Sequence, residues 1–249
     1  MNEFDKINKI AQSIVYCQRI CVVILIYIMH TALYGFVSTH HKNINFNLLT
    51  DLDKLFPFVP EMVYLYMSFY VVIVVSVFFL KTEEEFTRVI LSIIGTLLLT
   101  YPFYYFFPAN YPVTMFDATT VTTKFLKWCF AADIPNNTFP SLHVGLAFTI
   151  AFGIKQYKKK LGALYVIWAI GIALSTIMIR KHFLIDTFGG IVMATFSYNH
   201  FVRGRLINPI LASIVKRKNY LVGVIARQFS VKYLSRNAAY LLITILRMK

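Results

Sequence analysis

Charged side chains are scarce in this chain. Lys, Arg, Asp and Glu supply 14% of its 249 residues and 58% of the residues are hydrophobic, whereas soluble domains carry about 25% charged and about 45–50% apolar residues. The mean hydropathy is correspondingly high, at +0.63. The composition excludes an ordinary water-soluble domain and indicates an integral membrane protein.

Cysteine is also rare, which excludes a disulfide framework. The three cysteines are Cys17, Cys21 and Cys129. Cys17 and Cys21 are four residues apart, on one face of a predicted helix, but no third ligand lies near them to complete a metal site. We expect this pair to be small apolar packing residues.

Acidic residues are missing altogether after Asp186. The chain beyond residue 202 instead carries ten cations among Leu, Ile, Val and Tyr: Arg203, Arg205, Lys216, Arg217, Lys218, Arg227, Lys232, Arg236, Arg247 and Lys249. Such a segment could bind nucleic acid, but beside a membrane span it more simply contacts anionic lipid headgroups. We expect a basic amphipathic tail, 203–249, on the cytoplasmic membrane surface, and no nucleic-acid partner.

Long apolar runs, by contrast, are abundant. Six of them are long enough to be transmembrane helices: 13–37, 61–80, 89–108, 141–157, 161–180 and 182–202. The first is too long for a signal peptide and no small-residue cleavage site follows it, so we expect a retained anchor helix. The expected fold is an all-α integral membrane protein, in which a six-transmembrane helix bundle over residues 1–202 forms the catalytic membrane domain.

The positions of Lys and Arg predict the orientation of this bundle. Cations cluster before the first span, at 81–88, at 158–160 and in the tail, all on one side of a six-span topology, and positive loops stay cytoplasmic. Both termini are then cytoplasmic, and the other connections face the periplasm, the cell exterior or an organelle lumen. Arg180 and Lys181 break the pattern, and an anionic substrate on the outer side would explain them.

The longest outer connection, 108–140, contains Lys124, Lys127 and Trp128 among aromatic residues. This mixture predicts a partly amphipathic helix or lid at the depth of the lipid headgroups.

Two histidine motifs lie on the predicted outer side. His143 ends the stretch FPSLH at the start of the span 141–157, and His182 begins the stretch HFLID at the start of the span 182–202. Ionisable side chains are costly at the edge of lipid, so their presence there indicates a functional site. Helix-capping histidines would be the alternative, but the pairing of two motifs at one membrane face favours catalysis.

The spacing within the motifs fits phosphoryl transfer. On a helix, Asp186 would lie one turn from His182 and accept its ring N–H, leaving the other nitrogen free as a nucleophile. Pro140 suits a first helical turn, where the N–H groups of Ser141 and Leu142 would be unpaired and would form an anion site with the Ser141 hydroxyl. His143 could then protonate a leaving alkoxide and later deprotonate an acceptor. These are the parts of a displacement at phosphorus through a phosphohistidine.

The motifs resemble those of the type 2 phosphatidic acid phosphatase superfamily, within it the branch of inositol phosphorylceramide synthase and, more distantly, sphingomyelin synthase. The resemblance rests on 139–143 and 175–186 and extends more weakly to 56–61 and 105–108. It implies that His182 is the nucleophile, Asp186 its partner and His143 the acid/base. It also implies six spans with an outward active site.

The sequence departs from the phosphatase branch at two places. That branch has an Arg six residues before the second His and a Lys/Arg-Pro motif before the first, where this chain has Thr176 and, around 110–112, no cation. A dianionic phosphate needs strong charge clamping, so we favour transfer of a phospholipid headgroup to a lipid alcohol. Substrate-binding candidates are Ser141, Leu142, Arg180, Lys181, Lys124 and Lys127.

Three alternatives stay open. The chain could hydrolyse a lipid phosphate, such as phosphatidic acid or a prenyl pyrophosphate, with water as the acceptor. It could be a proton-coupled transporter, although only His30 approaches the middle of a span, or a scaffold with a degenerate site. No metal or other cofactor is expected, because no carboxylate cluster of the magnesium-binding type occurs at the outer face. The oligomeric state is left open.

Overall fold

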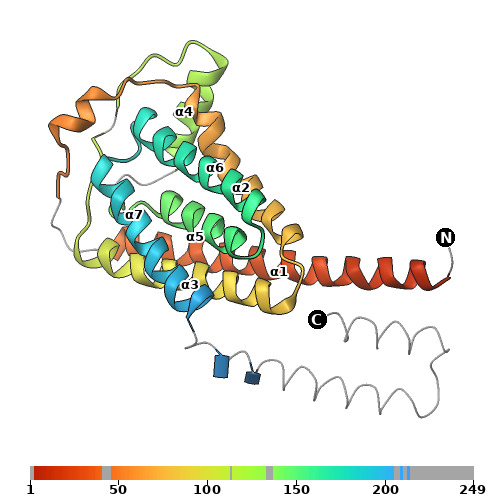
Figure 1. Ribbon diagram of the computed structural model, residues 1–249. Coiled ribbons are helices and arrows are strands. Elements are labelled where there is room, and N and C mark those ends of the chain that lie inside the picture. The colour runs from red at the N-terminus through yellow and green to blue at the C-terminus, as the bar shows by residue number, and fades with distance from the viewer. Residues whose placement is uncertain are drawn as a thin grey trace.

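The regular secondary structure in the described part of the chain is helical (Figure 1). The computed structural model describes residues 3–40, 46–112, 114–132, 137–204, 208–209 and 212–213. These ranges contain no strand, only an isolated bridge between Phe46 and Ala109. The predicted all-α fold is confirmed. The elements are α1 (Glu3–His40), η1 (Asp51–Leu55), α2 (Met62–Ser76), η2 (Val77–Phe79), α3 (Glu83–Phe106), α4 (Val121–Ala131), α5 (Leu142–Tyr157), α6 (Lys159–Met178), α7 (Leu184–Ser197) and the π-helical η3 (Tyr198–Arg203).

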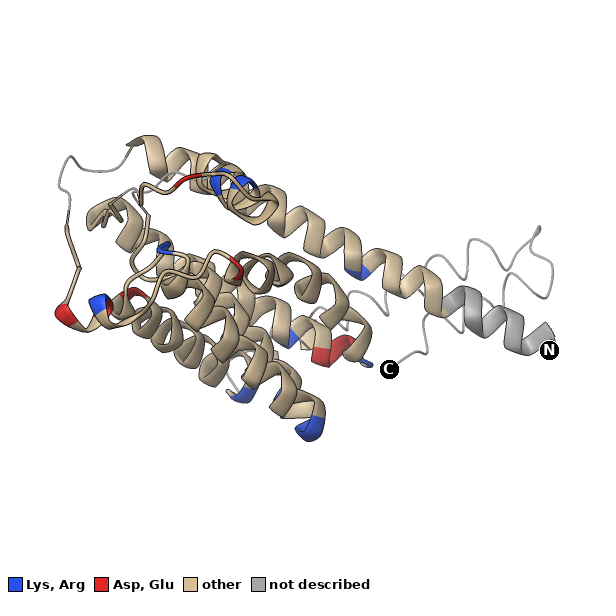
Figure 2. Cartoon of the chain, turned by 90° about the horizontal axis from the view of Figure 1, so that it is seen from above, with Lys and Arg blue, Asp and Glu red and all other residues tan. Residues whose placement is uncertain are grey.

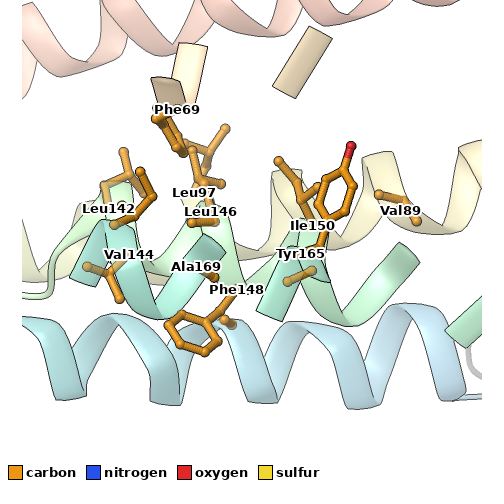
Figure 3. Close-up of a cluster of buried hydrophobic side chains, with 14 of the residues drawn as sticks. Phe69, Val89, Leu97, Leu142, Val144, Leu146, Phe148, Ile150, Tyr165 and Ala169 are labelled. Carbon is orange, nitrogen blue, oxygen red and sulfur yellow. The ribbon is translucent and has the colours of Figure 1, made fainter. Parts of the chain in front are cut away.

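Helix α5 is the centre of the bundle, with α3, α6 and α7 packed around it (Figures 1 and 3). Eleven of its 16 residues are buried, because its sequence is apolar or small on every face. Figure 3 shows Leu146, Phe148 and Ile150 of α5 among apolar side chains of the surrounding helices. This packing holds in place the N-terminal end of α5, where the FPSLH motif lies.

Two glycines allow α5 and α7 to approach closely at that end. Gly190 of α7 lies so near α5 that an added Cβ would be 2.5 Å from the carbonyl oxygen of Ser141. Gly145 of α5 faces it, with an added Cβ 3.3 Å from the Gly190 oxygen. Since no side chain fits between these backbones, the two glycines determine how closely the FPSLH and HFLID motifs approach each other.

Four helices of the described chain are long and apolar enough to cross a membrane: Gln12–His40, Met62–Phe79, Glu83–Phe106 and Lys159–Met178. They coincide with the predicted spans 13–37, 61–80, 89–108 and 161–180. The other two predicted spans, 141–157 and 182–202, correspond to α5 and α7, which have 16 and 14 residues, fewer than the roughly 20 that usually span a bilayer. The four apolar helices indicate a membrane protein, and the predicted number of six spans is not confirmed.

Helix α1 extends beyond the bundle (Figure 1), and from Gln12 onward most of its residues are exposed or partly exposed. Cys17 and Cys21 lie on its exposed face, so the prediction that they are packing residues is wrong. The inward residue of this stretch is Arg19, whose exposed fraction is 3%. Its guanidinium donates to the Leu80 carbonyl and pairs with Glu83 at 3.0 Å. These partners offset the cost of burying its charge.

The predicted amphipathic helix within 108–140 is α4. On its inner face Leu126 is completely buried, whereas the exposed fraction of Trp128 on the other face is 60%, so the amphipathic character is confirmed. In the described chain, charged residues lie mostly at helix ends and in connections (Figure 2). Nearly all of the predicted basic tail, 203–249, lies outside the described residues.

Candidate active site

The two motif histidines meet at one end of the bundle. His143 is the second residue of α5, and His182 lies in the turn between α6 and α7. Their ring centroids are 6.2 Å apart, although 39 residues separate them in the sequence. The His182 side chain is almost completely buried. One small reacting group could therefore contact both imidazoles.

The FPSLH motif forms the cap of α5 in a way that differs from the prediction. The N-cap residue is Ser141, whose hydroxyl accepts the Val144 N–H at 3.5 Å, so Pro140 lies just before the cap instead of in the first turn. The Ser141 N–H is not free, because it donates to the Asp186 carbonyl at 2.9 Å. Leu142, the first helical residue, has an N–H with no acceptor inside the helix. The anion site is thus reduced to the first-turn amides of α5.

Aromatic side chains of α2 surround His143. Its Nε2 lies 2.9 Å from the Tyr66 hydroxyl and 3.3 Å from that of Tyr70. The Tyr66 ring also packs on the imidazole, with centroids 4.6 Å apart, and Phe69 approaches to 5.2 Å. Tyr66 was not predicted from the sequence. The signal was present, since two tyrosines spaced i, i+4 place two hydroxyl groups on one face of an apolar helix.

His182 does not lie on a helix, so the predicted helical pairing with Asp186 is wrong in its geometry. Helix α6 ends in a Schellman motif, in which the Lys181 N–H donates to Thr176 O and the Arg180 N–H donates to Ile177 O. His182 follows that motif, and its N–H also donates to Thr176 O, at 3.2 Å. The turn orients the imidazole from outside α7.

Asp186 remains the electrostatic partner of His182. It is the third residue of α7, and one of its oxygens, Oδ2, accepts the Phe183 N–H at 2.9 Å and lies 3.5 Å from His182 Nδ1. Its other oxygen, Oδ1, and His182 Nδ1 are buried without a hydrogen-bond partner among the described residues. A carboxylate at this distance stabilises an imidazolium, and buried unsatisfied polar atoms are typical of functional sites.

The four predicted substrate-binding cations have different surroundings. The Arg180 guanidinium donates to Asp53 O at 3.2 Å and to Phe56 O at 2.8 Å. Lys181 donates to Cys129 O at 3.4 Å, and its ammonium lies 4.5 Å from the centre of the Phe130 ring. Lys124 and Lys127 are exposed on α4. Arg180 therefore contacts η1 and its C-cap residue, and Lys181 contacts α4. Their binding of substrate stays a prediction.

A buried carboxylate that sequence analysis missed lies beside the His182 turn. Asp53, with an exposed fraction of 1%, accepts the Thr50 hydroxyl at 2.6 Å and the Leu184 N–H at 2.7 Å. Burial alone would raise the pKa of Asp53. These two hydrogen bonds, a third from the Thr50 N–H and the positive charge of Arg180 lower the pKa by more than burial raises it, so the pKa lies below its usual value. Thr-x-x-Asp at 50–53 is a capping-box pattern that could have indicated the turn.

Two further ionisable residues lie away from the histidine pair. His30 bonds to the Tyr101 hydroxyl between α1 and α3, and Glu61 is the exposed N-cap of α2. In the described ranges, His, Cys, Asp and Glu side chains form no group of three that could hold a metal ion.

Comparison with known proteins identifies the family. A family model described as the PAP2 superfamily matches residues 39–199, a range that contains both histidine motifs and more than half of the chain. No curated protein sequence and no solved structure gives a match. The motif pair, the meeting of its histidines and the extent of this match lead to one conclusion: the chain belongs to the PAP2 superfamily, whose members are typically phosphatases or phosphotransferases.

Proposed function

We propose that the protein is an integral membrane enzyme that transfers a phospholipid headgroup to a lipid alcohol through a phosphohistidine. The observation that carries the proposal is the 6.2 Å approach of the His143 and His182 rings. His143 lies in the first turn of α5 and His182 two residues before α7, and these two helices approach closely at glycines, so the relative position of the histidines is well defined. A nucleophile and an acid/base that face one phosphorus atom must be held in this way.

In the first step, His182 attacks phosphorus through the nitrogen that does not face Asp186. The phosphorus–oxygen bond to the leaving lipid breaks, and His143 donates a proton to the departing alkoxide, which leaves as an alcohol. The nitrogen–phosphorus bond that forms places positive charge on the His182 ring, and the Asp186 carboxylate stabilises it.

In the second step, His143 accepts a proton from the incoming hydroxyl group. The hydroxyl oxygen attacks phosphorus, the nitrogen–phosphorus bond breaks, and both histidines return to their starting states. A lipid alcohol as acceptor gives a new phospholipid, and water gives a hydrolysed product. The same residues therefore serve transferase and phosphatase chemistry, and the acceptor decides between them.

An apolar groove that is lined in part by one residue of each motif supports a lipid substrate. Its volume is about 270 Å³, and it is lined by Phe46, Leu48, Phe103, Phe107, Ala109, Phe139 and Ile185. Phe139 immediately precedes the PSLH residues and Ile185 immediately precedes Asp186. A hydrocarbon chain could lie here while its headgroup reaches the histidines.

The partners of Arg180 favour headgroup transfer over phosphomonoester hydrolysis. A phosphomonoester dianion needs close cationic clamping, whereas a phosphodiester carries one charge. The Arg180 guanidinium already donates to two backbone carbonyls, and Thr176 occupies the position of the arginine in the phosphatase branch. A lipid phosphate phosphatase is the alternative, with Lys181, Lys124 or Lys127 moving to bind the phosphate.

We further propose that all six apolar segments span the membrane, with both termini cytoplasmic and the histidines on the extracytoplasmic side. Helix α7 continues directly into η3, so residues 184–203 form one helical run long enough to cross. Helix α5, buried among its neighbours, would cross without touching much lipid. Residues 1–202 would form the catalytic domain, and the tail 203–249 would lie on anionic lipid at the cytoplasmic surface.

Incubation of the purified full-length protein with defined lipids tests this function. One reaction contains phosphatidic acid, and another contains a glycerophospholipid together with ceramide or diacylglycerol. We expect a new phospholipid in the second reaction and little free phosphate in the first. Free phosphate alone would favour the phosphatase, and the absence of both products across a panel of lipids would contradict either enzyme.

A further inference from the structure

The segment that precedes α2 packs along the turn that carries His182, although about 130 residues separate them in the chain. The Val59 N–H donates to Met178 O at 3.0 Å, at the end of α6. Further along the turn, the Arg180 guanidinium and the Leu184 N–H bond to residues 53–56. The turn is thus held from outside by one short segment.

Asp53 supplies the two bonds that enclose His182. Its carbonyl oxygen accepts from Arg180 at 3.2 Å, two residues before the histidine. Its carboxylate oxygen Oδ1 accepts the Leu184 N–H at 2.7 Å, two residues after it. One residue therefore fixes the chain on both sides of the nucleophile.

The environment of Asp53 keeps its carboxylate in place and able to accept hydrogen bonds. The side chain is buried, and Oδ2 is held by the Thr50 N–H at 2.8 Å and the Thr50 hydroxyl at 2.6 Å. An ionised carboxylate is an acceptor only, which suits three donors. If an amide replaced the carboxylate, its NH2 group would face one of these donors instead of accepting from it.

The backbone of Arg180 is strained, and its side-chain hydrogen bonds to residues 53–56 offset that strain. It has a positive φ of 62°, at the position of a Schellman motif where glycine is usual because other residues are strained there. An arginine is nevertheless present, and its guanidinium bonds to Asp53 O and Phe56 O. The side chain and the strained backbone together direct the chain into the His182 turn.

We propose that Asp53 is a positioning residue for His182. Helical packing holds His143, whereas His182 does not belong to a helix. Asp53 holds His182 instead, by fixing the backbone on both sides of it. This inference rests on the proposed nucleophilic role of His182. It predicts that Asp53 acts on the alignment of the nucleophile with phosphorus and leaves lipid binding nearly unchanged.

The test compares Asp53→Asn with Asp51→Asn. Asp51 lies in the same turn, but its side chain is 94% exposed and pairs with Lys54 on the surface. We expect kcat of Asp53→Asn to fall by roughly 10- to 100-fold, the effect of small misplacements of reacting groups, with KM changed by less than about twofold. Asp51→Asn should match the unmodified protein.

Inhibition by orthovanadate separates positioning from loss of folded protein. Vanadate takes the five-coordinate geometry of the phosphoryl transition state, so its inhibition constant should rise for Asp53→Asn in proportion to the loss of kcat. A smaller fraction of folded enzyme would lower kcat without changing that constant. Thr50→Val, which removes one donor to Oδ2, should give a smaller change in the same direction.

Three outcomes would overturn the proposal. In the first, kcat and the vanadate inhibition constant of Asp53→Asn equal those of Asp51→Asn. In the second, kcat falls but the vanadate inhibition constant is unchanged, and in the third, neither Asp53→Asn nor Thr50→Val folds. His182→Ala, measured in the same assays, distinguishes failure of the proposed function. If His182→Ala keeps its turnover, the nucleophile is wrong, whereas an inactive His182→Ala with an unaffected Asp53→Asn rejects only the positioning role.

Discussion

The two histidines of the site are held in different ways. His143 belongs to the buried helix α5, and aromatic rings of α2 pack on its imidazole. His182 lies in a turn whose backbone is fixed by directional hydrogen bonds to residues 53–56. The difference fits the chemistry proposed for each, because an acid/base must reach a proton, whereas a nucleophile must lie in line with the bond that breaks.

Removal of His182 should have the largest effect. Without the nucleophile the covalent route is lost, so turnover by His182→Ala should fall by about 10³-fold or more. The matched control is His200→Ala, because His200 lies in η3 beyond the opposite end of α7 and stacks on Phe196. Product formation with the purified variants measures the effect. Undiminished turnover of His182→Ala would remove this residue from the mechanism.

Removal of His143 should have a smaller effect that depends on the leaving group. General acid–base catalysis contributes about 10²- to 10⁴-fold, and an alkoxide needs the proton whereas a nitrophenolate does not. His143→Ala should therefore lose much less activity on an alkyl nitrophenyl phosphodiester than on the natural lipid. His182→Ala should lose activity on both substrates. Equal losses of His143→Ala on the two substrates would contradict its role as the acid.

The close approach of α5 and α7 can be disturbed at Gly190. Gly190→Ala would place a methyl group 2.5 Å from Ser141 O, so the helices must separate and move the two histidines apart. We expect a loss of stability of about 1–3 kcal/mol and a fall in turnover of roughly tenfold. Thermal unfolding in detergent and turnover measure the two effects. Gly35→Ala is the control, because nothing lies within 4 Å of an added Cβ there.

The smallest expected effect is that of the Tyr66 hydroxyl. Tyr66→Phe keeps the ring that packs on His143 and removes the hydrogen bond to Nε2, which is worth about 1 kcal/mol, or roughly a fivefold change in kcat. Tyr64→Phe, on the same helix, removes a hydroxyl that contacts Thr122 instead and should leave kcat unchanged. If the two variants behave alike, the Tyr66 hydroxyl does not help to hold His143.

The sequence predicted those features of this molecule that depend on local pattern. Apolar length located the four candidate spans and also α5 and α7, and the amphipathic segment became α4. The histidine motifs were found because each combines an unusual residue with a helix start, and the structure brings their rings together.

Features that depend on contacts distant in sequence were missed or misjudged. Asp53 was overlooked because its partner Leu184 lies 131 residues further along, and nothing in residues 50–56 indicates that pairing. The prediction that His182 and Asp186 share a helix was wrong because the Schellman motif of α6 extends through Lys181. A motif of this kind is defined by backbone hydrogen bonds and does not produce a periodic pattern of apolar residues in the sequence. Arg19 was missed because a single cation in an apolar helix does not reveal its acceptors.

The left-handed conformation of Arg180 has a consequence for how this protein could change under selection. A glycine there would relax the backbone by about 1–2 kcal/mol, but it would release residues 53–56 from the turn before His182. The two guanidinium hydrogen bonds that Arg180→Gly removes are together worth at least as much as the strain that it relieves. Arg180→Gly should therefore lose turnover without gaining stability, and the arginine serves both properties at this position.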